Sequence, residues 1–429
     1  MLNHPTILVK DRCINLTKMK SRIFLLFLLS NLTTSVYSQD KDCSCKTDLT
    51  FLDSKIRKTP AYKVNKEAYN TSYSKIAKEV TSINSVFDCY TLLNKLLISL
   101  NDNHSKIYGV DLGATDKVKA SPDELNNFKK SALFNAYPKP NIDLDSLRAV
   151  LNSKTKMELE GVYTRKNYMT IGVYKNEDKE SYKAIILESE SDVWQVGEIM
   201  YVLIPFGNDY LLSIGGSTPS KRLIAYTERI ENGFFYFMGF QKDISETNYA
   251  AKMPSEDTYY REELSNETTY LKIGSFNSWY PTLSDAEKFY KTLEGNLNKS
   301  NLIVDLRNNG GGGDRNSDII YKLLKDYAKK NKIYVLINHR TVSNAEQFAN
   351  RLRNLENCKL FGIRTNGTLA YEIKAESYTL PCGNFIAVLS SKKNSDYLAF
   401  ESTGIEPEIT YDMNSDWIEQ LKNYIKSNN

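Results

Sequence analysis

The sequence predicts a multi-domain α+β protein whose C-terminal part is an α/β core. Three observations support this prediction. Helical periodicity dominates residues 47–135, short β-branched and aromatic runs fill residues 159–240, and strand and helix patterns alternate from about residue 267. The 429 residues suffice for two or three domains, and a hydrophobic content of 41% is typical of a globular chain.

The first 38 residues have the pattern of a secretory signal peptide. A basic stretch ends at Arg22, the apolar run 23–30 follows, and Val36 and Ser38 occupy the small-residue positions of a cleavage site. The apolar run is too short to span a bilayer. We therefore expect residues 1–38 to be removed and the protein to be exported by a bacterium to the periplasm or beyond, without an integral membrane span. The alternative is a buried N-terminal helix.

The charge distribution argues against a nucleic-acid partner. The formal net charge of the chain is +4, and the leader alone carries five basic residues against Asp11. The remainder is therefore neutral overall, and it lacks the global basic field that attracts phosphate backbones.

Cysteine usage fits an exported protein in which some cysteines form disulfides. Cys358 and Cys382 flank two predicted strands and are candidates to pair with each other. Either Cys43 or Cys45 is a candidate partner of Cys89. No second Cys or His pair follows Cys43 and Cys45 at zinc spacing, so no metal site is expected there.

Residues 39–142 are predicted to form an N-terminal helical domain. Val86, Tyr90, Leu93 and Leu97 lie on one stripe at helical spacing. A later helix opens at Ser121 with a capping box and with proline in its first turn.

Residues 143–255 are predicted to form a β-rich inserted domain, either a barrel or a sandwich. Its apolar runs are short, β-branched and aromatic, and polar turns separate several of them. The runs are 168–174, 182–189, 198–204, 210–216, 221–230 and 233–240.

Residues 256–429 are predicted to contain βαβ units and a parallel sheet, because strand patterns alternate with helical patterns of ten to fifteen residues. The predicted strands are 269–276, 301–306, 332–338 and 359–363. A β-hairpin is expected over 378–391.

Two segments of this region have residues suited to chemistry. In 302–314, LIVDLRNNGGGGD, a strand runs into four glycines, whose backbone can approach a ligand closely and whose N–H groups can stabilise an anion. The alternative is a flexible turn. Ser343 lies where a strand and a tight turn give way to a helix, which suits a nucleophile but also suits a helix N-cap.

Other candidates lie elsewhere in the chain. His104, at the end of a helix next to Asp102, suits a general base, although a histidine there can also simply compensate the helix dipole. His339 is expected to be an exposed turn residue. Glu401 precedes a turn at Gly404 and, taken alone, is expected to be solvated.

Together and in this order, the motifs resemble those of the C-terminal processing (tail-specific) peptidase family. DLRNNGGG resembles its strand-plus-glycine signature, TVSNAEQFA its nucleophile motif, FGIRTNG its Gly-x-x-Thr-x-Gly segment, and GIEPEI its closing segment. The likeness covers about 267–412, and LNDNHSKI is an outlying segment that resembles Asp-Gly-His-Thr.

The resemblance implies a serine hydrolase with a crotonase-like catalytic core. Many members use a Ser–Lys dyad, but here Thr368 stands in the lysine position and the next lysine is Lys374. The tricorn-like branch uses Ser, His and Glu, and Ser343, His104 and Glu401 occupy those places. Residues 145–250 show no loop like that of the PDZ domain that many members carry.

We therefore expect a secreted serine endopeptidase in which His104 serves Ser343 as the base and Glu401 supports His104. The N–H groups of Gly311 and Asn344 are expected to form the oxyanion hole, and Gly310 and Gly312 to contact protein or peptide substrates. No metal or organic cofactor is expected. Two alternatives stay open: an inactive relative that binds a peptide or small ligand, and a hydrolase of non-peptide acyl groups.

Overall fold

The computed structural model describes residues 43–178, 180–207, 209–373 and 377–428. The predicted signal peptide, residues 1–38, lies outside the described residues, and so does Lys374. None of the described helices is both long enough and apolar enough to cross a membrane.

The N-terminal segment is mostly helical, as predicted. Its hydrophobic stripe lies on α4, where Tyr90, Leu93 and Leu97 are buried, and α6 begins after Ser121, whose hydroxyl accepts the N–H of Glu124. The helices are α1 (Cys45–Ile56), α2 (Pro60–Val64), α3 (Lys66–Glu79), α4 (Val86–Ile98), α5 (Asp116–Ala120), α6 (Pro122–Lys129) and α7 (Leu144–Asn152), with a 3-10 turn at Val80–Ser82.

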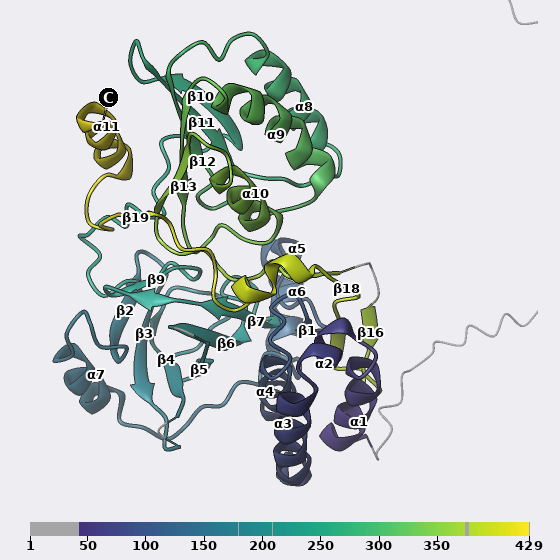
Figure 1. Ribbon diagram of the computed structural model, residues 1–429. Coiled ribbons are helices and arrows are strands. Elements are labelled where there is room, and N and C mark those ends of the chain that lie inside the picture. The colour runs from purple at the N-terminus through teal and green to yellow at the C-terminus, as the bar shows by residue number, and fades with distance from the viewer. Residues whose placement is uncertain (1–42, 179, 208, 374–376, 429) are drawn as a thin grey trace, which may run out of the picture. The chain divides into compact units, whose positions relative to one another are not determined.

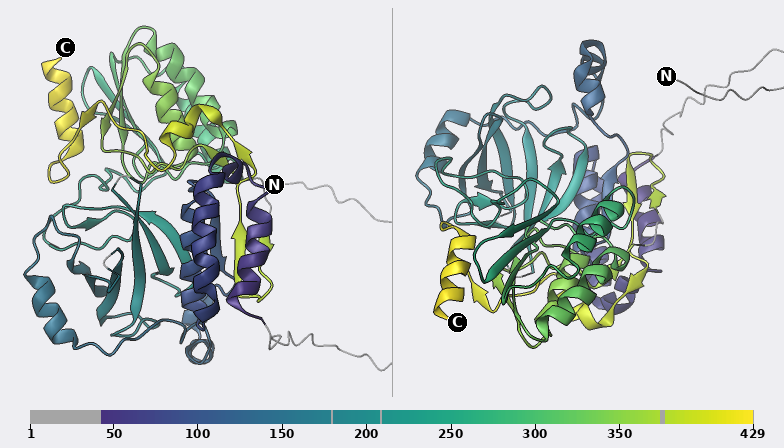
Figure 2. Two further views of the ribbon diagram at one scale, coloured as in Figure 1. Left: turned by 60° about the horizontal axis from the view of Figure 1, so that its bottom comes forward. Right: turned by 90° about the horizontal axis from the view of Figure 1, so that it is seen from above.

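A strand interrupts this helical segment where helical periodicity alone did not predict one. β1 (Lys106–Gly109) pairs antiparallel with β17 (Phe385–Val388), and β17 pairs with β16 (Ser377–Thr379). The predicted hairpin over 378–391 is thus confirmed, and it acquires a third strand from far away in the sequence. Figure 2 shows the N-terminal helices beside this hairpin.

The middle of the chain forms a six-stranded antiparallel meander, which agrees with the predicted β-rich character. The strands are β2 (Gly161–Arg165), β3 (Met169–Lys175), β4 (Tyr182–Ser189), β5 (Ile199–Phe206), β6 (Tyr210–Gly216) and β7 (Leu223–Glu228), paired in that order. A short pair follows, β8 (Ile230–Glu231) with β9 (Phe234–Phe235). Gln241 forms isolated bridges to Phe234 and to Thr164 on β2, which join the short pair to the edge of the sheet. This curved sheet with its short pair, residues 161–241 (Figure 1), is called the barrel below.

The C-terminal sheet has parallel strands, as predicted, with one antiparallel edge. Its order is β10 (Tyr259–Glu263), β11 (Thr268–Ile273), β12 (Asn301–Asp305), β13 (Lys332–Ile337), β14 (Cys358–Gly362) and β19 (Ile409–Thr410), and only β10 runs antiparallel to its neighbour.

Helices cover both faces of this sheet (Figure 1). On one face lie α8 (Thr282–Leu293), α9 (Asp314–Ala328) and α10 (Asn344–Arg353), packed on the alternating apolar residues of the strands. On the other face lies α11 (Trp417–Ser427), where Trp417, Leu421 and Ile425 join the core. Because parallel strands share one carboxyl edge, the loops after β12 and β13 are neighbours, and they carry the glycine run and Ser343.

The remaining short elements lie between β14 and β19 in the sequence. β15 (Tyr371–Glu372) pairs with β18 (Lys392–Lys393), and a 3-10 helix, Ser395–Phe400, leads to Glu401.

Two disulfides tie the N-terminal segment to itself and to the hairpin. Cys45 pairs with Cys89, one of the two alternatives that the sequence left open. The predicted Cys358–Cys382 pair is wrong, because Cys382 bonds to Cys43 and Cys358 is a buried free thiol on β14. The packing of the N-terminal helices on the hairpin brings Cys43 to Cys382.

Candidate active site

Ser343 lies at the junction between the loop after β13 and the start of α10. Its backbone has φ 59° and ψ −123°, a conformation that a side chain with a Cβ rarely adopts. The carboxylate of Glu346, three residues after Ser343, accepts the Ser343 N–H at 2.9 Å and so holds this turn. Strained backbone of this kind concentrates at sites where it orients a reactive group.

His104 reaches Ser343 from the other end of the chain. Its Nε2 lies 3.0 Å from Ser343 Oγ, although the two residues are 239 positions apart. The loop that carries His104 follows α4, and Asp102 Oδ1 fixes it by accepting the N–H groups of His104 and Ser105. Burial lowers the pKa of His104 to about 4, although the charge of Asp102 opposes that shift. The imidazole is therefore neutral at neutral pH and can accept a proton.

The Nδ1 atom of His104 is buried and has no hydrogen-bond partner among the described residues. A ring nitrogen of His104 and carboxylate oxygens of Asp102 and Glu401 lie within 4.8 Å of one another. Neither carboxylate is hydrogen-bonded to the imidazole in the described part of the chain.

Glu401 is nearly buried and accepts three backbone N–H groups. Its Oε1 accepts that of Asn103 at 2.8 Å, and its Oε2 accepts those of Leu369 at 2.9 Å and Ala370 at 2.7 Å. Burial raises the pKa of Glu401 to about 8, against the effect of these N–H donors. Taken alone, Glu401 was expected to be exposed to solvent. That prediction is wrong, because Glu401 is only 2% exposed.

Asp102 has a separate set of partners. Its Oδ2 accepts the hydroxyl groups of Ser105 and Ser390, and Ser105 Oγ accepts the N–H of Ser390. Asp102 therefore anchors the histidine loop to the hairpin.

The Asp102, His104 and Glu401 atoms are close enough to hold a cation, but His104 Nε2 contacts Ser343 and both carboxylates accept backbone N–H groups. This arrangement suits proton transfer better than metal ligation.

The glycine run lies against Ser343, and Gly311 makes the closest approach. A Cβ built on Gly311 would come within 2.6 Å of Val342 O and 2.9 Å of Ser343 Cβ, so no larger residue fits without a shift. The predicted oxyanion role of Gly311 does not fit its contacts, because its N–H donates to Asn309 Oδ1 at 2.9 Å. The N–H groups of Gly310, Gly312 and Asn344 have no hydrogen-bond acceptor within the described ranges.

Asn309 joins three parts of the site. Its side-chain N–H donates to Ile273 O at the end of β11, its Oδ1 accepts the Gly311 N–H, and its carbonyl accepts the Val342 N–H at 3.0 Å. The glycine run and the Ser343 turn are thereby held together.

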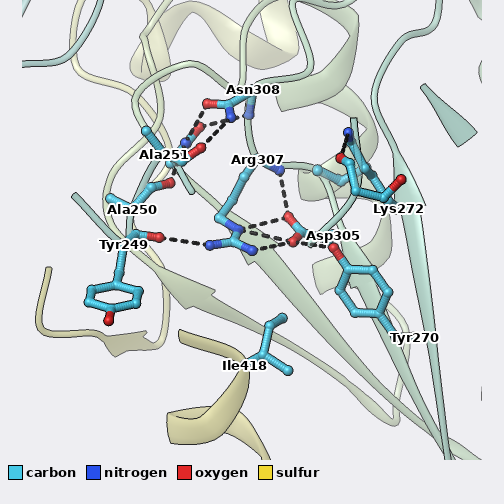
Figure 3. Close-up of polar contacts among 12 residues, drawn as sticks. Tyr249, Ala250, Ala251, Tyr270, Lys272, Asp305, Arg307, Asn308 and Ile418 are labelled. Atoms are coloured by element: carbon cyan, nitrogen blue, oxygen red, sulfur yellow. Dashed lines mark hydrogen bonds and ion pairs between the residues drawn. The ribbon is translucent and has the colours of Figure 1, made fainter. Parts of the chain in front are cut away.

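A buried ion pair fixes the base of the glycine loop (Figure 3). Arg307 is 1% exposed, and its guanidinium donates to both carboxylate oxygens of Asp305, which Tyr270 also contacts. Three consecutive backbone carbonyls of the segment before β10 accept hydrogen bonds from side chains in the loops after β12 and β13. Arg307 donates to Tyr249 O, Asn338 to Ala250 O and Asn308 to Ala251 O.

His339 is not the exposed turn residue that the sequence predicted. It is fully buried, stacked on Tyr210 from the barrel and packed edge-on against Tyr236 and Phe237. Burial lowers its pKa well below the usual range of histidine. The barrel supplies this aromatic enclosure, which no local pattern around His339 could reveal.

Thr368 is buried where Ser–Lys members carry lysine, and it donates its N–H to Glu346. Sequence reasoning gave Asn309 no role, named Asp102 only as the neighbour of His104, and named Glu346 only as a possible helix-cap partner and as part of the nucleophile motif. The signal for Glu346 was its position three residues after Ser343, where a carboxylate can return to the start of a helix.

Comparison with known proteins finds one family that part of the chain resembles. Residues 267–329 and 316–411 match the model of peptidase family S41. No curated protein matches the sequence.

Many solved structures are similar to this chain as well, among them the following three. Mature CPAF is 12% identical, covering 89% of this chain and 96% of that one at a TM-score of 0.46. The photosystem II D1 C-terminal processing protease is 15% identical, covering 88% and 96% at 0.37. The tricorn protease is 14% identical, covering 89% of this chain and 37% of that one at 0.41.

The similarity to family S41 rests on the sequence match. That match takes in the glycine run, Ser343 and the segment that Glu346 holds, but neither His104 nor the barrel. The segment 267–411, which includes Ser343, is similar to peptidase family S41.

Proposed function

We propose that this protein is an exported serine endopeptidase that cleaves peptide bonds through an acyl-enzyme on Ser343. The observation that carries the proposal is the 3.0 Å contact between Ser343 Oγ and the Nε2 of a half-buried, neutral His104. A hydroxyl that donates to a neutral imidazole is the arrangement that activates a serine nucleophile.

In the proposed reaction, Ser343 Oγ attacks the scissile carbonyl carbon while its proton passes to His104 Nε2. The tetrahedral intermediate then collapses as His104 gives that proton to the leaving amine, which departs with the C–N bond electrons. Water repeats the sequence on the ester, with His104 again as the base, and restores Ser343.

The developing oxyanion needs N–H donors that are not otherwise engaged. Asn344 N–H, directly after Ser343 at the start of α10, is one such donor. We assign the second to the glycine run, at Gly310 or Gly312 instead of Gly311. Each donor of this kind is typically worth about 2.7–4 kcal/mol of transition-state stabilisation.

Glu401 is the proposed partner of the imidazolium. Its Oε1 accepts one N–H whereas its Oε2 accepts two, so Oε1 retains acceptor capacity toward the unpartnered Nδ1–H of His104. Asp102 is a weaker choice, because two N–H groups and two hydroxyls already occupy its oxygens. The Ser, His and Glu set corresponds to the tricorn-like branch that the sequence resembles.

The domain layout belongs to the same proposal: signal peptide 1–38, helical domain 39–142, β-rich domain 143–255 and a crotonase-like peptidase domain 256–429. The two disulfides support export, since such bonds persist in oxidising compartments.

The test is Ser343→Ala. We expect loss of casein hydrolysis by about 10⁴-fold or more with an unchanged thermal unfolding midpoint, because only the nucleophile is removed. A fluorophosphonate probe should label the wild type and not the variant. If the variant cleaves as well as the wild type, or if the wild type turns over only simple acyl esters, the endopeptidase proposal is wrong.

A further inference from the structure

We propose that Glu346 is a positioning residue which, with Glu401 and the segment 365–370, sets the distance between Ser343 and His104. This inference rests on the proposed function and adds to it a residue whose part in the reaction is indirect.

Glu346 joins Ser343 to the segment 365–370. It is fully buried, and its Oε2 accepts the N–H groups of Ser343 and Thr368, each at 2.9 Å. Its Oε1 accepts the N–H of Gly367 at 2.7 Å and the hydroxyl of Thr365 at 2.6 Å. Four donors thus converge on one carboxylate, and one of them is the backbone of the nucleophile itself.

Glu401 continues the same pattern toward the histidine. The next two N–H groups of the segment, those of Leu369 and Ala370, donate to its Oε2. Its Oε1 accepts the N–H of Asn103, the residue before His104. The side chain of Asn103 also donates to Gly367 O at 2.8 Å.

The N–H groups of residues 367–370 are therefore divided between two buried carboxylates. One carboxylate holds the backbone of Ser343 and the other holds the backbone next to His104. The two reacting side chains come from positions 239 residues apart, and this shared segment connects their backbones by direct hydrogen bonds.

The segment is itself fixed from both sides. Thr365 exchanges two hydrogen bonds with Ile405, and Tyr210 of the barrel donates its hydroxyl to Thr365 O at 2.6 Å. Because the segment is rigid, it can hold Glu346 and thereby the backbone of Ser343 in place. A mobile segment would let Ser343 relax from its φ of 59°.

Glu228 in the barrel is a matched control for Glu346. Glu228 is also fully buried and also accepts backbone N–H groups, those of Arg229, Phe237 and Met238. Burial raises the pKa of each of these two glutamates to about 7. Only Glu346 holds a residue that reacts.

The experiment compares Glu346→Gln with Glu228→Gln in the full mature chain. In each variant an amide NH₂ replaces one oxygen and faces backbone N–H groups, so we expect both unfolding midpoints to fall. We expect only Glu346→Gln to lower both kcat on labelled casein and the rate of fluorophosphonate labelling, by about 100-fold, as for a misplacement of about 1 Å. KM should stay within about twofold of the wild-type value.

Glu346→Asp serves as a second variant should the glutamine variant fail to fold. It keeps the charge on a shorter side chain, and we expect it to lower kcat with little change in the unfolding midpoint. If the Glu346 variants label and turn over as fast as Glu228→Gln does, the positioning role is overturned while the proposed function stands. A wild type that neither labels nor cleaves would instead overturn the proposed function and this inference with it.

Discussion

Two buried charged clusters in this molecule contrast in how completely their members are paired. In the barrel, Lys221 is fully buried, and its Nζ donates to Glu198 at 2.7 Å and to Phe134 O at 2.9 Å. The rings of Phe134, Tyr137 and Trp194 surround the ammonium group. At the candidate active site, two buried carboxylates lie near a half-buried imidazole, whose buried Nδ1 remains without a partner in the described chain.

This difference indicates that the Lys221–Glu198 cluster has a structural role, whereas the cluster around His104 is suited to chemistry. A closed pair such as Lys221 and Glu198 has satisfied its strongest hydrogen-bonding groups and gains nothing from moving a proton. The imidazole has Nε2 on a hydroxyl and Nδ1 unpartnered, so its Nδ1–H is free to bond a carboxylate when Nε2 takes up the Ser343 proton. An incompletely paired buried group next to a strained serine is therefore the better marker of reactivity.

Among the tests of this contrast, the largest effect is expected from removing the carboxylate charge of Glu401 next to the imidazole. Glu401→Gln should lower kcat by about 10³- to 10⁴-fold, because an uncharged amide cannot stabilise the imidazolium that forms as Ser343 loses its proton. Steady-state kinetics on casein measure the effect. Glu198→Gln makes the same exchange in the closed cluster and should leave kcat within about twofold. If kcat falls equally in the two variants, the proposed difference between the clusters is wrong.

The next effect concerns stability alone. Lys221→Met removes one partner of the closed pair and leaves Glu198 buried without its cation, which should cost about 3–5 kcal/mol in the free energy of unfolding. Denaturant unfolding measures the loss. The folded fraction should retain wild-type kcat, since the pair does not touch the site. A variant that loses kcat and keeps its stability would contradict the structural role of the pair.

The sequence alone predicted much of this framework. Strand and helix alternation predicted the parallel sheet, and short β-branched runs predicted a β-rich region that could be a barrel or a sandwich, because both patterns record which side chains face a core. The order of the motifs predicted that His104 and Ser343 belong to one site, and the structure places them in contact. Their catalytic roles stay predictions.

What the sequence missed depends on long-range packing. His339 is buried because aromatic residues of the barrel reach it, and Cys382 pairs with a cysteine 339 residues away. The Gly311 N–H is occupied because Asn309 folds back two residues, a turn detail that glycine content does not encode. The segment 365–370 connects two motifs only through backbone N–H groups, which have no side-chain signature.

The smallest effect, and the one that most sharpens the contrast, is the pH dependence of kcat/KM. Burial lowers the pKa of His104 to about 4 and raises the pKa of Glu401 to about 8. Since the reaction needs a neutral imidazole and an ionised carboxylate, kcat/KM should rise with pH through a limb near 8. An ordinary histidine base would put this limb near 6.5. Glu401→Gln should remove it, whereas Glu198→Gln should leave it in place.

The same two shifts act on stability in opposite directions. The raised pKa of Glu401 makes its contribution to folding greatest below pH 4.5, and that contribution is lost as pH rises toward 8. The lowered pKa of His104 makes its contribution present above pH 6.5 and lost as pH falls toward 4. The protein should therefore become more active through pH 8 while the Glu401 contribution to its stability declines. A wild-type limb near 6.5 that survives in Glu401→Gln would show that the site titrates as an ordinary solvated histidine, and the contrast with the closed pair would then fail.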